Sequence, residues 1–179
     1  MALPSSGDLR FPLGEFVPPH VITPRDVRAW IHDIAECPSR MRAAIAGLSE
    51  EQLDTPYRNG GWTVRQVVHH LPDSHMNGYI RTRMALTEEN PVIKPYTEAA
   101  WAELEDARTM TVDVSLALLE ALHHRWVRLL DCLPDPAFER TYVHPEMGRV
   151  PIGLQMALYS WHSRHHVAHI TLLRGRRGW

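Results

Sequence analysis

Hydrophobic side chains recur every three or four positions over four long stretches of the chain, a spacing that places them on one face of a helix. The stretches run over about residues 24–47, 64–86, 112–132 and 153–174. A shorter helix is predicted over residues 98–106. Four long helices with one or two long connections predict an all-α protein, a four-helix bundle.

Capping residues stand at the ends of these predicted helices. Thr23 precedes Pro24, the arrangement of an N-cap followed by proline at the first helical position. Thr63 and Gln66 have the spacing of a capping box. Gly175 is placed to end the last helix, because glycine readily adopts the left-handed conformation found after a helix C-terminus.

The connections and two internal prolines shape this outline. Residues 88–96 form a long connection after the second long helix. Residues 137–151 hold aromatic and β-branched residues around a turn, which predicts a short hairpin or an irregular excursion before the last helix. Pro38 and Pro72 lie inside predicted helices and can kink or break them.

Length and composition indicate one domain. Residues 1–22 are rich in proline and lack helical spacing, which predicts an extended arm packed on a single domain of residues 23–179. The 179 residues, 44% of them hydrophobic, suffice for one full core. A net charge of -2 without a basic aromatic stripe argues against a nucleic-acid partner, and no apolar run is long enough to cross a membrane.

Cysteine usage and the N-terminal residues indicate a cytoplasmic protein. The two cysteines, Cys37 and Cys132, are far apart and neither belongs to a CxxC motif, so they are predicted to be reduced and a thiolate metal site is not expected. Residues 1–10 lack the apolar segment of a secretion signal.

Histidine is the unusual component, and four of the 12 histidines lie within residues 161–170. At about 100° per residue, His162, His166 and His169 fall on one helix face with Gln155 and Leu158. The opposite face is expected to be solvated; it carries Ala157, Ser160, Arg164 and Thr171. The histidine row therefore points into the bundle. His162 with His166, and His165 with His169, are both one turn apart, so spacing alone does not choose between the pairs.

A second cluster lies on the helix over residues 64–86. A polar stripe at successive turns comprises Gln66, His70, Ser74, Asn77 and Arg81. His69 and His70 point about 100° apart, and spacing does not decide which of them faces inward. His75, His123 and His124 are expected at the surface or behind the ligands, whereas His20, His32 and His144 give no signal.

Inward imidazoles from two helices predict a metal site, since unpaired buried polar groups are costly and imidazole is a frequent metal ligand. Three neutral imidazoles suit Zn²⁺, Ni²⁺, Co²⁺ or Fe²⁺ and leave one coordination position open for water or a thiolate. The reacting group would be that water or thiolate, and no catalytic side chain is predicted. The expected acceptors for the outer ring N–H groups are Asp73, Gln155, Glu120 or Asp131. No HExxH motif is present, which excludes the zinc-protease arrangement.

The sequence resembles the YfiT-type branch of the DinB superfamily over most of its length. The resemblance rests on DTPYRNGGWTVRQVVHHL at residues 54–71, DSHMN at 73–77, KPY at 94–96, YVHPE at 142–146 and WHSRHHVAHI at 161–170. It implies an up-down-down-up four-helix bundle that binds one divalent ion, zinc or nickel. The ligands it implies are His70, His162 and His166, with His165 and His169 behind them or along the pocket.

The resemblance also implies a class of chemistry. Members of the branch are described as metal-dependent hydrolases, and related bundles are S-transferases that use small thiols such as bacillithiol. We therefore expect a metal-dependent enzyme that activates water or a small thiol against a small electrophile, and a homodimer. Gln66, Asn77, Arg81 and Gln155 are the further pocket candidates. The alternative is a bundle that binds metal or ligand without catalysis.

Overall fold

The computed structural model describes residues 8–179 and contains the four long helices that the hydrophobic pattern predicts. They are α1 (Pro24–Ile45), α3 (Val64–Thr87), α6 (Val112–Asp131) and α7 (Ile152–Arg177). Their bounds lie within three residues of the predicted ones. The fold is a four-helix bundle, as expected.

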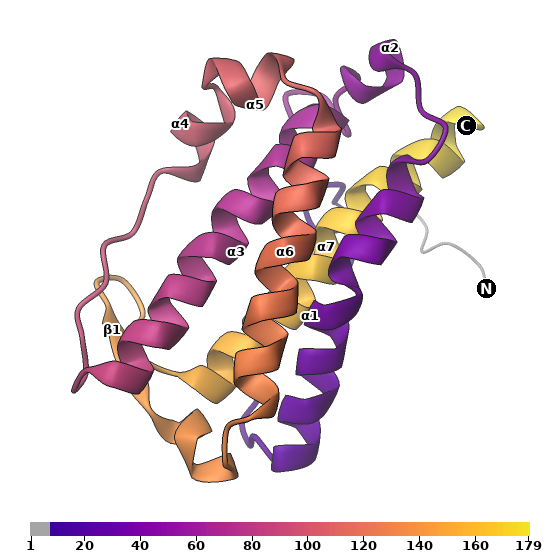
Figure 1. Ribbon diagram of the computed structural model, residues 1–179. Helices are drawn as coiled ribbons and strands as arrows, with labels where there is room; N and C mark the ends of the chain where they lie inside the picture. The colour runs from indigo at the N-terminus through magenta and orange to yellow at the C-terminus, as the bar shows by residue number, and fades with distance from the viewer. Residues whose placement is uncertain (1–7) are drawn as a thin grey trace.

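The four helices form a bundle in which consecutive long helices are not always neighbours. α1 packs against α6 and α7, and α3 packs against the same two helices, so α1 and α3 lie on opposite corners. Figure 1 shows α3 and α6 running in one direction and α1 and α7 in the other, which is the up-down-down-up order. The chain between α3 and α6 must therefore return along the full length of the bundle.

Short elements fill the connections. α2 (Glu50–Leu53) follows α1, and the return connection carries α4 (Glu98–Ala102) and α5 (Glu105–Thr109), where the sequence predicts one helix. η1 (Asp135–Glu139) precedes the hairpin of β1 (Thr141–His144) and β2 (Gly148–Pro151), whose strands pair antiparallel. The return connection docks beside β1 through hydrogen bonds that join Val143 to Pro91 and Ile93.

The helix caps follow the sequence at the N-termini and differ from it at the C-terminus. Thr23 and Thr63 both cap their helices in complete capping boxes, with Asp26 and Gln66. The expected stop at Gly175 is wrong: α7 continues to Arg177, and Gly178 takes the left-handed conformation with a φ of 70°. A glycine can sit inside an exposed last turn, so its presence alone did not mark the end.

Neither internal proline breaks its helix. α1 continues through Pro38 and α3 through Pro72. Each proline lacks the N–H that would bond to the carbonyl four residues earlier. The carbonyls of Ile34 and Val68 therefore lose their helical donor. None of the described helices has both the length and the apolarity needed to cross a membrane.

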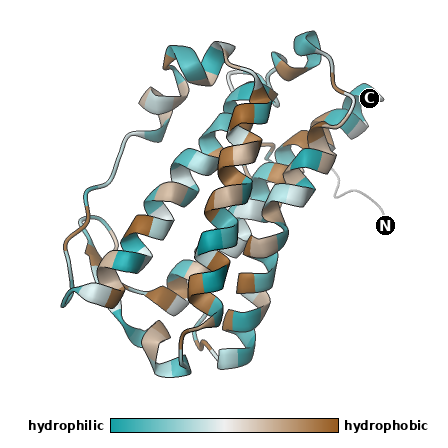
Figure 2. Ribbon diagram, in the orientation of Figure 1, coloured by the Kyte–Doolittle hydropathy of each residue, from teal (hydrophilic) through white to brown (hydrophobic). Residues whose placement is uncertain are grey.

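The buried interior consists of two apolar clusters separated by a polar layer. One cluster lies near α2 and includes Met41, Leu71 and Leu119, and the other lies near the hairpin and includes Trp126 and Met156. Between them, α3 and α7 contribute buried polar side chains, which include His70, Ser74, His75, Thr82, Ser160, Ser163, His165, His166 and His169. Figure 2 accordingly shows hydrophilic positions interleaved with hydrophobic ones along the long helices.

The expected solvated face of α7 is only partly solvated. Arg164 and Thr171 are exposed, but Ala157 and Ser160 are buried. α1 packs on this face, and the Ser160 hydroxyl donates to the Asp33 carboxylate over 2.7 Å. The helical spacing predicted a less apolar face, but a helix that packs against two neighbouring helices has little surface left for solvent.

α3 and α7 approach closely at Gly78. A Cβ built on this residue would lie 2.4 Å from the Tyr159 ring and 2.8 Å from the Trp126 ring. Tyr159 is fixed there, because its hydroxyl donates to the Ser74 carbonyl over 2.9 Å. The absent side chain at Gly78 thus lets the aromatic pair pack under the polar layer.

We expect Gly78→Ala to lower the free energy of unfolding by about 1–3 kcal/mol, because the added methyl overlaps two buried rings. Gly175→Ala is the matched control: it is helical, exposed and free of close contacts, so alanine should stabilise by about 0.5–1 kcal/mol. Urea denaturation of both variants measures the difference. A Gly78→Ala protein as stable as its parent would contradict this packing.

Candidate metal centre

Three histidine side chains from two helices converge in the polar layer. His70 of α3 faces His162 and His166 of α7, which are one turn apart on that helix. The Nε2 atom of His162 lies 3.3 Å from Nε2 of His70 and 3.2 Å from Nε2 of His166. All three residues thus present the same ring atom to a common point.

This geometry fits a tetrahedral metal ion. Two nitrogen ligands about 2.0–2.1 Å from a tetrahedral ion lie about 3.3–3.4 Å from one another. Both Nε2–Nε2 distances measured from His162 are close to that edge length. Donor type and spacing therefore both suit a divalent ion that accepts imidazole ligands.

Burial keeps these imidazoles neutral. It lowers the pKa of His70 to about 4 and holds the pKa values of His162 and His166 well below the usual range, with neighbouring histidines adding to the effect. At neutral pH each ring therefore carries one proton and one lone pair, which is the state that binds metal.

The Nδ1 atoms of His162 and His166, which point away from the cluster, contact other side chains. Nδ1 of His162 lies 3.1 Å from Nε2 of His75, whose Nδ1 lies 2.8 Å from Nε2 of His123. Nδ1 of His166 lies 3.4 Å from Nδ1 of His169. The expected carboxylate and amide partners are not used: these contacts are to other imidazoles.

The structure decides which member of each ambiguous pair faces the cluster. His69 is buried elsewhere, with its ring nitrogens 2.7 Å from the Ser115 hydroxyl and 3.1 Å from the Met110 carbonyl. His165 stacks on Trp161 with ring centroids 4.3 Å apart. Nε2 of His169 lies 3.1 Å from the Arg10 carbonyl, so neither His165 nor His169 pairs with His70.

Two other groups of possible ligand atoms exist among the described residues. His165, His166 and His169 cluster on α7, and Cys37, His75 and His123 cluster behind His162. His169 has contacts at both ring nitrogens, and so do His75 and His123. In the group of His70, His162 and His166, by contrast, the Nε2 atoms face one another beside a cavity.

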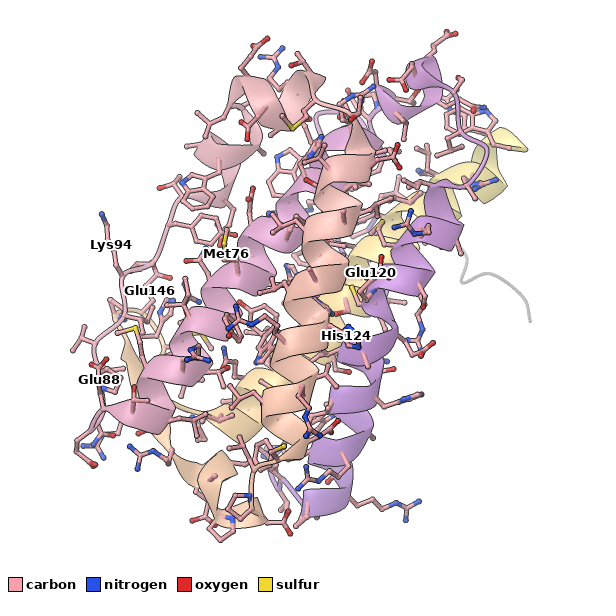
Figure 3. The ribbon with its side chains drawn as sticks, in the orientation of Figure 1. Met76, Glu88, Lys94, Glu120, His124 and Glu146 are labelled. Atoms are coloured by element: carbon pink, nitrogen blue, oxygen red, sulfur yellow. The ribbon has the colours of Figure 1, made fainter. Side chains whose placement is uncertain are left out.

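A cavity of about 480 Å³ opens beside the three histidines. Aromatic side chains form much of its wall, and they are Trp62, Tyr96, Tyr159 and Trp161. Charged side chains at its margin are Arg81, Glu98 and Glu146, the last on the hairpin turn and labelled in Figure 3. The cavity therefore offers apolar contacts, one cation and two anions around the cluster.

Two cavity-lining residues carry buried polar atoms that lack a protein hydrogen bond. Among the described residues, the buried side-chain atoms without a partner are the Tyr96 hydroxyl oxygen and Nδ1 of His165. Burial raises the pKa of Tyr96, so its hydroxyl stays protonated at neutral pH. Unpaired buried polar atoms are unfavourable, which makes both atoms contact points for a bound molecule.

The remaining sequence candidates divide between structural positions and the cavity. Gln66 is buried in its capping box and donates to the Ala102 carbonyl, and Asn77 donates to the Asp73 carbonyl. Gln155 is fully buried and donates to the Gly78 carbonyl over 2.7 Å. None of the three lines the cavity, whereas Arg81 does.

The sequence placed His75, His123 and His124 either at the surface or behind the ligands, and the structure separates them. His75 and His123 are fully buried behind His162, while His124 lies on the exposed side of α6, where Figure 3 labels it. Tyr96 and His144 line the cavity from the return connection and the hairpin. The sequence carried no signal for His144, whose burial becomes visible only in the alternating pattern of the folded β1.

Comparisons with known proteins agree on the family. A profile of the DinB superfamily matches residues 33–170. A protein of Bacillus cereus (strain ATCC 10987 / NRS 248) and one of Bacillus thuringiensis subsp. konkukian (strain 97-27) are each 54% identical over 172 residues, which cover 96% of this chain and 99% of theirs. Both bear the name "Putative metal-dependent hydrolase".

Solved structures give the same answer. YfiT from Bacillus subtilis, described as a "probable metal-dependent hydrolase with an unusual four-helix bundle topology", superposes with a TM-score of 0.92 at 49% identity, covering 96% of this chain and 98% of its own. TT2238, a four-helix bundle protein, has a TM-score of 0.56 at 16% identity, covering 86% and 99%, and shares the fold alone. The profile, the relatives and the YfiT structure together establish that the chain belongs to the DinB superfamily.

Proposed function

We propose that this protein is a metal-dependent hydrolase that holds one divalent ion, zinc or nickel, through His70, His162 and His166. The observation that carries the proposal is the convergence of three neutral Nε2 atoms, two of them 3.2–3.3 Å from the third, beside a cavity. The names of the B. cereus and B. thuringiensis relatives and the description of YfiT support the same chemistry.

Three protein ligands leave one position of a tetrahedral ion open, the pattern of catalytic sites rather than structural ones. When bound, such an ion lowers the pKa of a water molecule and polarises an electrophile. His70 and His166 are buried, and His162 is partly exposed to the cavity. The open position would therefore face the cavity.

The cavity walls supply the means to hold a small substrate. The rings of Trp62 and Trp161 line the cavity and offer apolar contact; their centroids lie 4.7 Å from that of His70 and 4.3 Å from that of His165, respectively. The protonated Tyr96 hydroxyl can donate a hydrogen bond to an oxygen of the substrate. We assign Tyr96 the role of orienting the electrophile.

Metal content tests the ligand set. Protein purified without a metal-affinity tag should carry about one divalent ion per chain by elemental analysis. His162→Ala and His166→Ala should lose most of it. His165→Ala is the matched control, one residue away on the same helix, and should retain more metal than His166→Ala. Substoichiometric metal that His162→Ala leaves unchanged would refute the site.

Turnover tests the reaction. The metal-loaded protein is offered a panel of small esters, epoxides and chlorinated electrophiles, with and without a low-molecular-weight thiol. Hydrolysis without thiol is expected; turnover only with thiol would show an S-transferase, and no turnover across the panel would indicate a binding protein. Tyr96→Phe should lower kcat/KM about tenfold or more with unchanged metal content, because one substrate hydrogen bond is lost. Equal kcat/KM would remove Tyr96 from the site.

The buried histidines also predict how metal-free protein responds to acid. The pKa values of His70 and His123 are about 4 in the folded chain, against about 6.5 when unfolded. As pH falls below about 6.5 the unfolded chain binds protons first, so stability present above that pH is lost between pH 6.5 and 4, by up to about 1.4 kcal/mol per pH unit for each group. Urea denaturation of chelator-treated protein from pH 8 to 5 measures this. A flat profile would show that these rings are not buried and neutral.

A further inference from the structure

Two buried histidines behind His162 have no place in the proposed reaction. His75 of α3 and His123 of α6 are 0% and 2% exposed. They continue the line from His162 away from the cavity and end at the backbone of α1, where Nδ1 of His123 lies 2.6 Å from the Ile34 carbonyl oxygen. The chain of contacts therefore crosses the whole bundle.

The end of this chain fixes the direction of every hydrogen bond in it. A carbonyl oxygen only accepts, so Nδ1 of His123 must carry the proton that it donates to Ile34. Burial keeps His123 neutral, with a pKa of about 4, and its Nε2 therefore has a lone pair that accepts from Nδ1–H of His75. By the same step, Nε2 of His75 accepts from Nδ1–H of His162.

The last link leaves the lone pair of His162 on Nε2, the atom that faces His70 and His166. We propose that His75 and His123 are positioning residues that hold His162 in the tautomer competent to bind metal. This inference rests on the proposed function in taking His162 as a ligand. The hydrogen bond at one ring nitrogen sets which tautomer the other presents, and that is how partners behind a ligand tune a metal site.

Pro38 explains why the Ile34 carbonyl is available. In a regular helix that carbonyl would accept from the N–H of residue 38, which proline lacks. The carbonyl bonds instead to His123. The proline inside α1 thus creates a buried acceptor at the point where the histidine chain ends.

His166 has a shorter chain of the same kind. The Arg10 carbonyl lies 3.1 Å from Nε2 of His169, so that nitrogen donates, and Nδ1 of His169 is left to accept from Nδ1–H of His166 over 3.4 Å. The lone pair of His166 is again on Nε2. The tautomer of each proposed α7 ligand, His162 and His166, is therefore fixed by a chain of hydrogen bonds that ends at a backbone carbonyl outside α7.

The competing explanation for His75 and His123 is a second metal ion, since Cys37 lies close to both. Two observations disfavour it. All four ring nitrogens of these histidines are used in the contacts described above. Burial raises the pKa of the Cys37 thiol to about 11, so it is protonated rather than a thiolate ligand.

The test begins with the metal-free protein labelled with ¹⁵N at histidine. Long-range proton–nitrogen NMR spectra distinguish the two neutral tautomers, and His162 is expected to carry its proton on Nδ1. This measurement does not depend on whether the protein binds metal or turns over substrate. A proton on Nε2 of His162 would overturn the proposal, while wild-type protein that binds no metal would refute the proposed function instead.

Zinc affinity, measured by competition with a chelator, tests the consequence. His123→Leu removes the acceptor for His75 and should weaken zinc binding about 10–100-fold. His123→Gln can still donate to Ile34 and accept from His75, and should recover most of the affinity. Cys37→Ala alters the same buried region without entering the chain, and should leave affinity and stoichiometry unchanged.

Two results in these variants would overturn the proposal: a folded His123→Leu protein with wild-type zinc affinity, or a second zinc ion that Cys37→Ala abolishes. If His123→Leu does not fold, the tautomer of His162 in the unmodified protein and the zinc affinity of His123→Gln still decide the matter. A zinc affinity of His123→Gln that is about 10–100-fold weaker would contradict rescue by a hydrogen-bonding side chain, and so would overturn the proposal.

Discussion

The structure depends on one constraint: a row of imidazoles lies inside a helical bundle, where burying a ring is unfavourable unless it is neutral and hydrogen bonded. Two apolar clusters enclose this layer from both ends of the bundle. Within it, His162 and His166 each have a contact behind them and His70 in front. A metal ion would replace the unfavourable approach of three lone pairs by three bonds. The burial that destabilises the metal-free cluster is therefore also what would favour a bound ion there.

Elements outside α3 and α7 help to meet this constraint. α1 contributes the Ile34 carbonyl, released from its helix by Pro38, and the segment before α1 contributes the Arg10 carbonyl. That segment also accepts a hydrogen bond from the Trp161 indole at Gly14. Because a carbonyl can only accept, each such contact fixes a direction that a hydroxyl or water would leave free. Parts of the chain that carry no proposed ligand therefore end the hydrogen-bond chains that lead to His162 and His166.

The bundle and an inward row of histidines could be predicted from the sequence because both are local patterns: helical spacing gave the four helices and placed histidines one turn apart on one face. The choice of His70 over His69, and of His162 with His166 over His165 with His169, required the resemblance to a family, since it depends on how α3 and α7 are rotated against each other. The sequence left His75 and His123 either at the surface or behind the ligands, because their contacts join residues of all four long helices. Pro38 was interpreted only as a possible kink, because the role of the Ile34 carbonyl as an acceptor becomes visible only when the fold brings His123 beside it.

The register between α3 and α7 decides whether their histidines meet, and polar contacts one turn apart set it. Gln155 donates to the Gly78 carbonyl, and one turn later Tyr159 donates to the Ser74 carbonyl. One further turn along α7, and one turn back along α3, brings His162 opposite His70. Each step advances α7 by three or four residues and retreats α3 by four, as antiparallel helices require. Gln155, whose place on the histidine face suggested a pocket role, acts instead as the first contact of this series, and a shift of one turn there would separate the imidazoles.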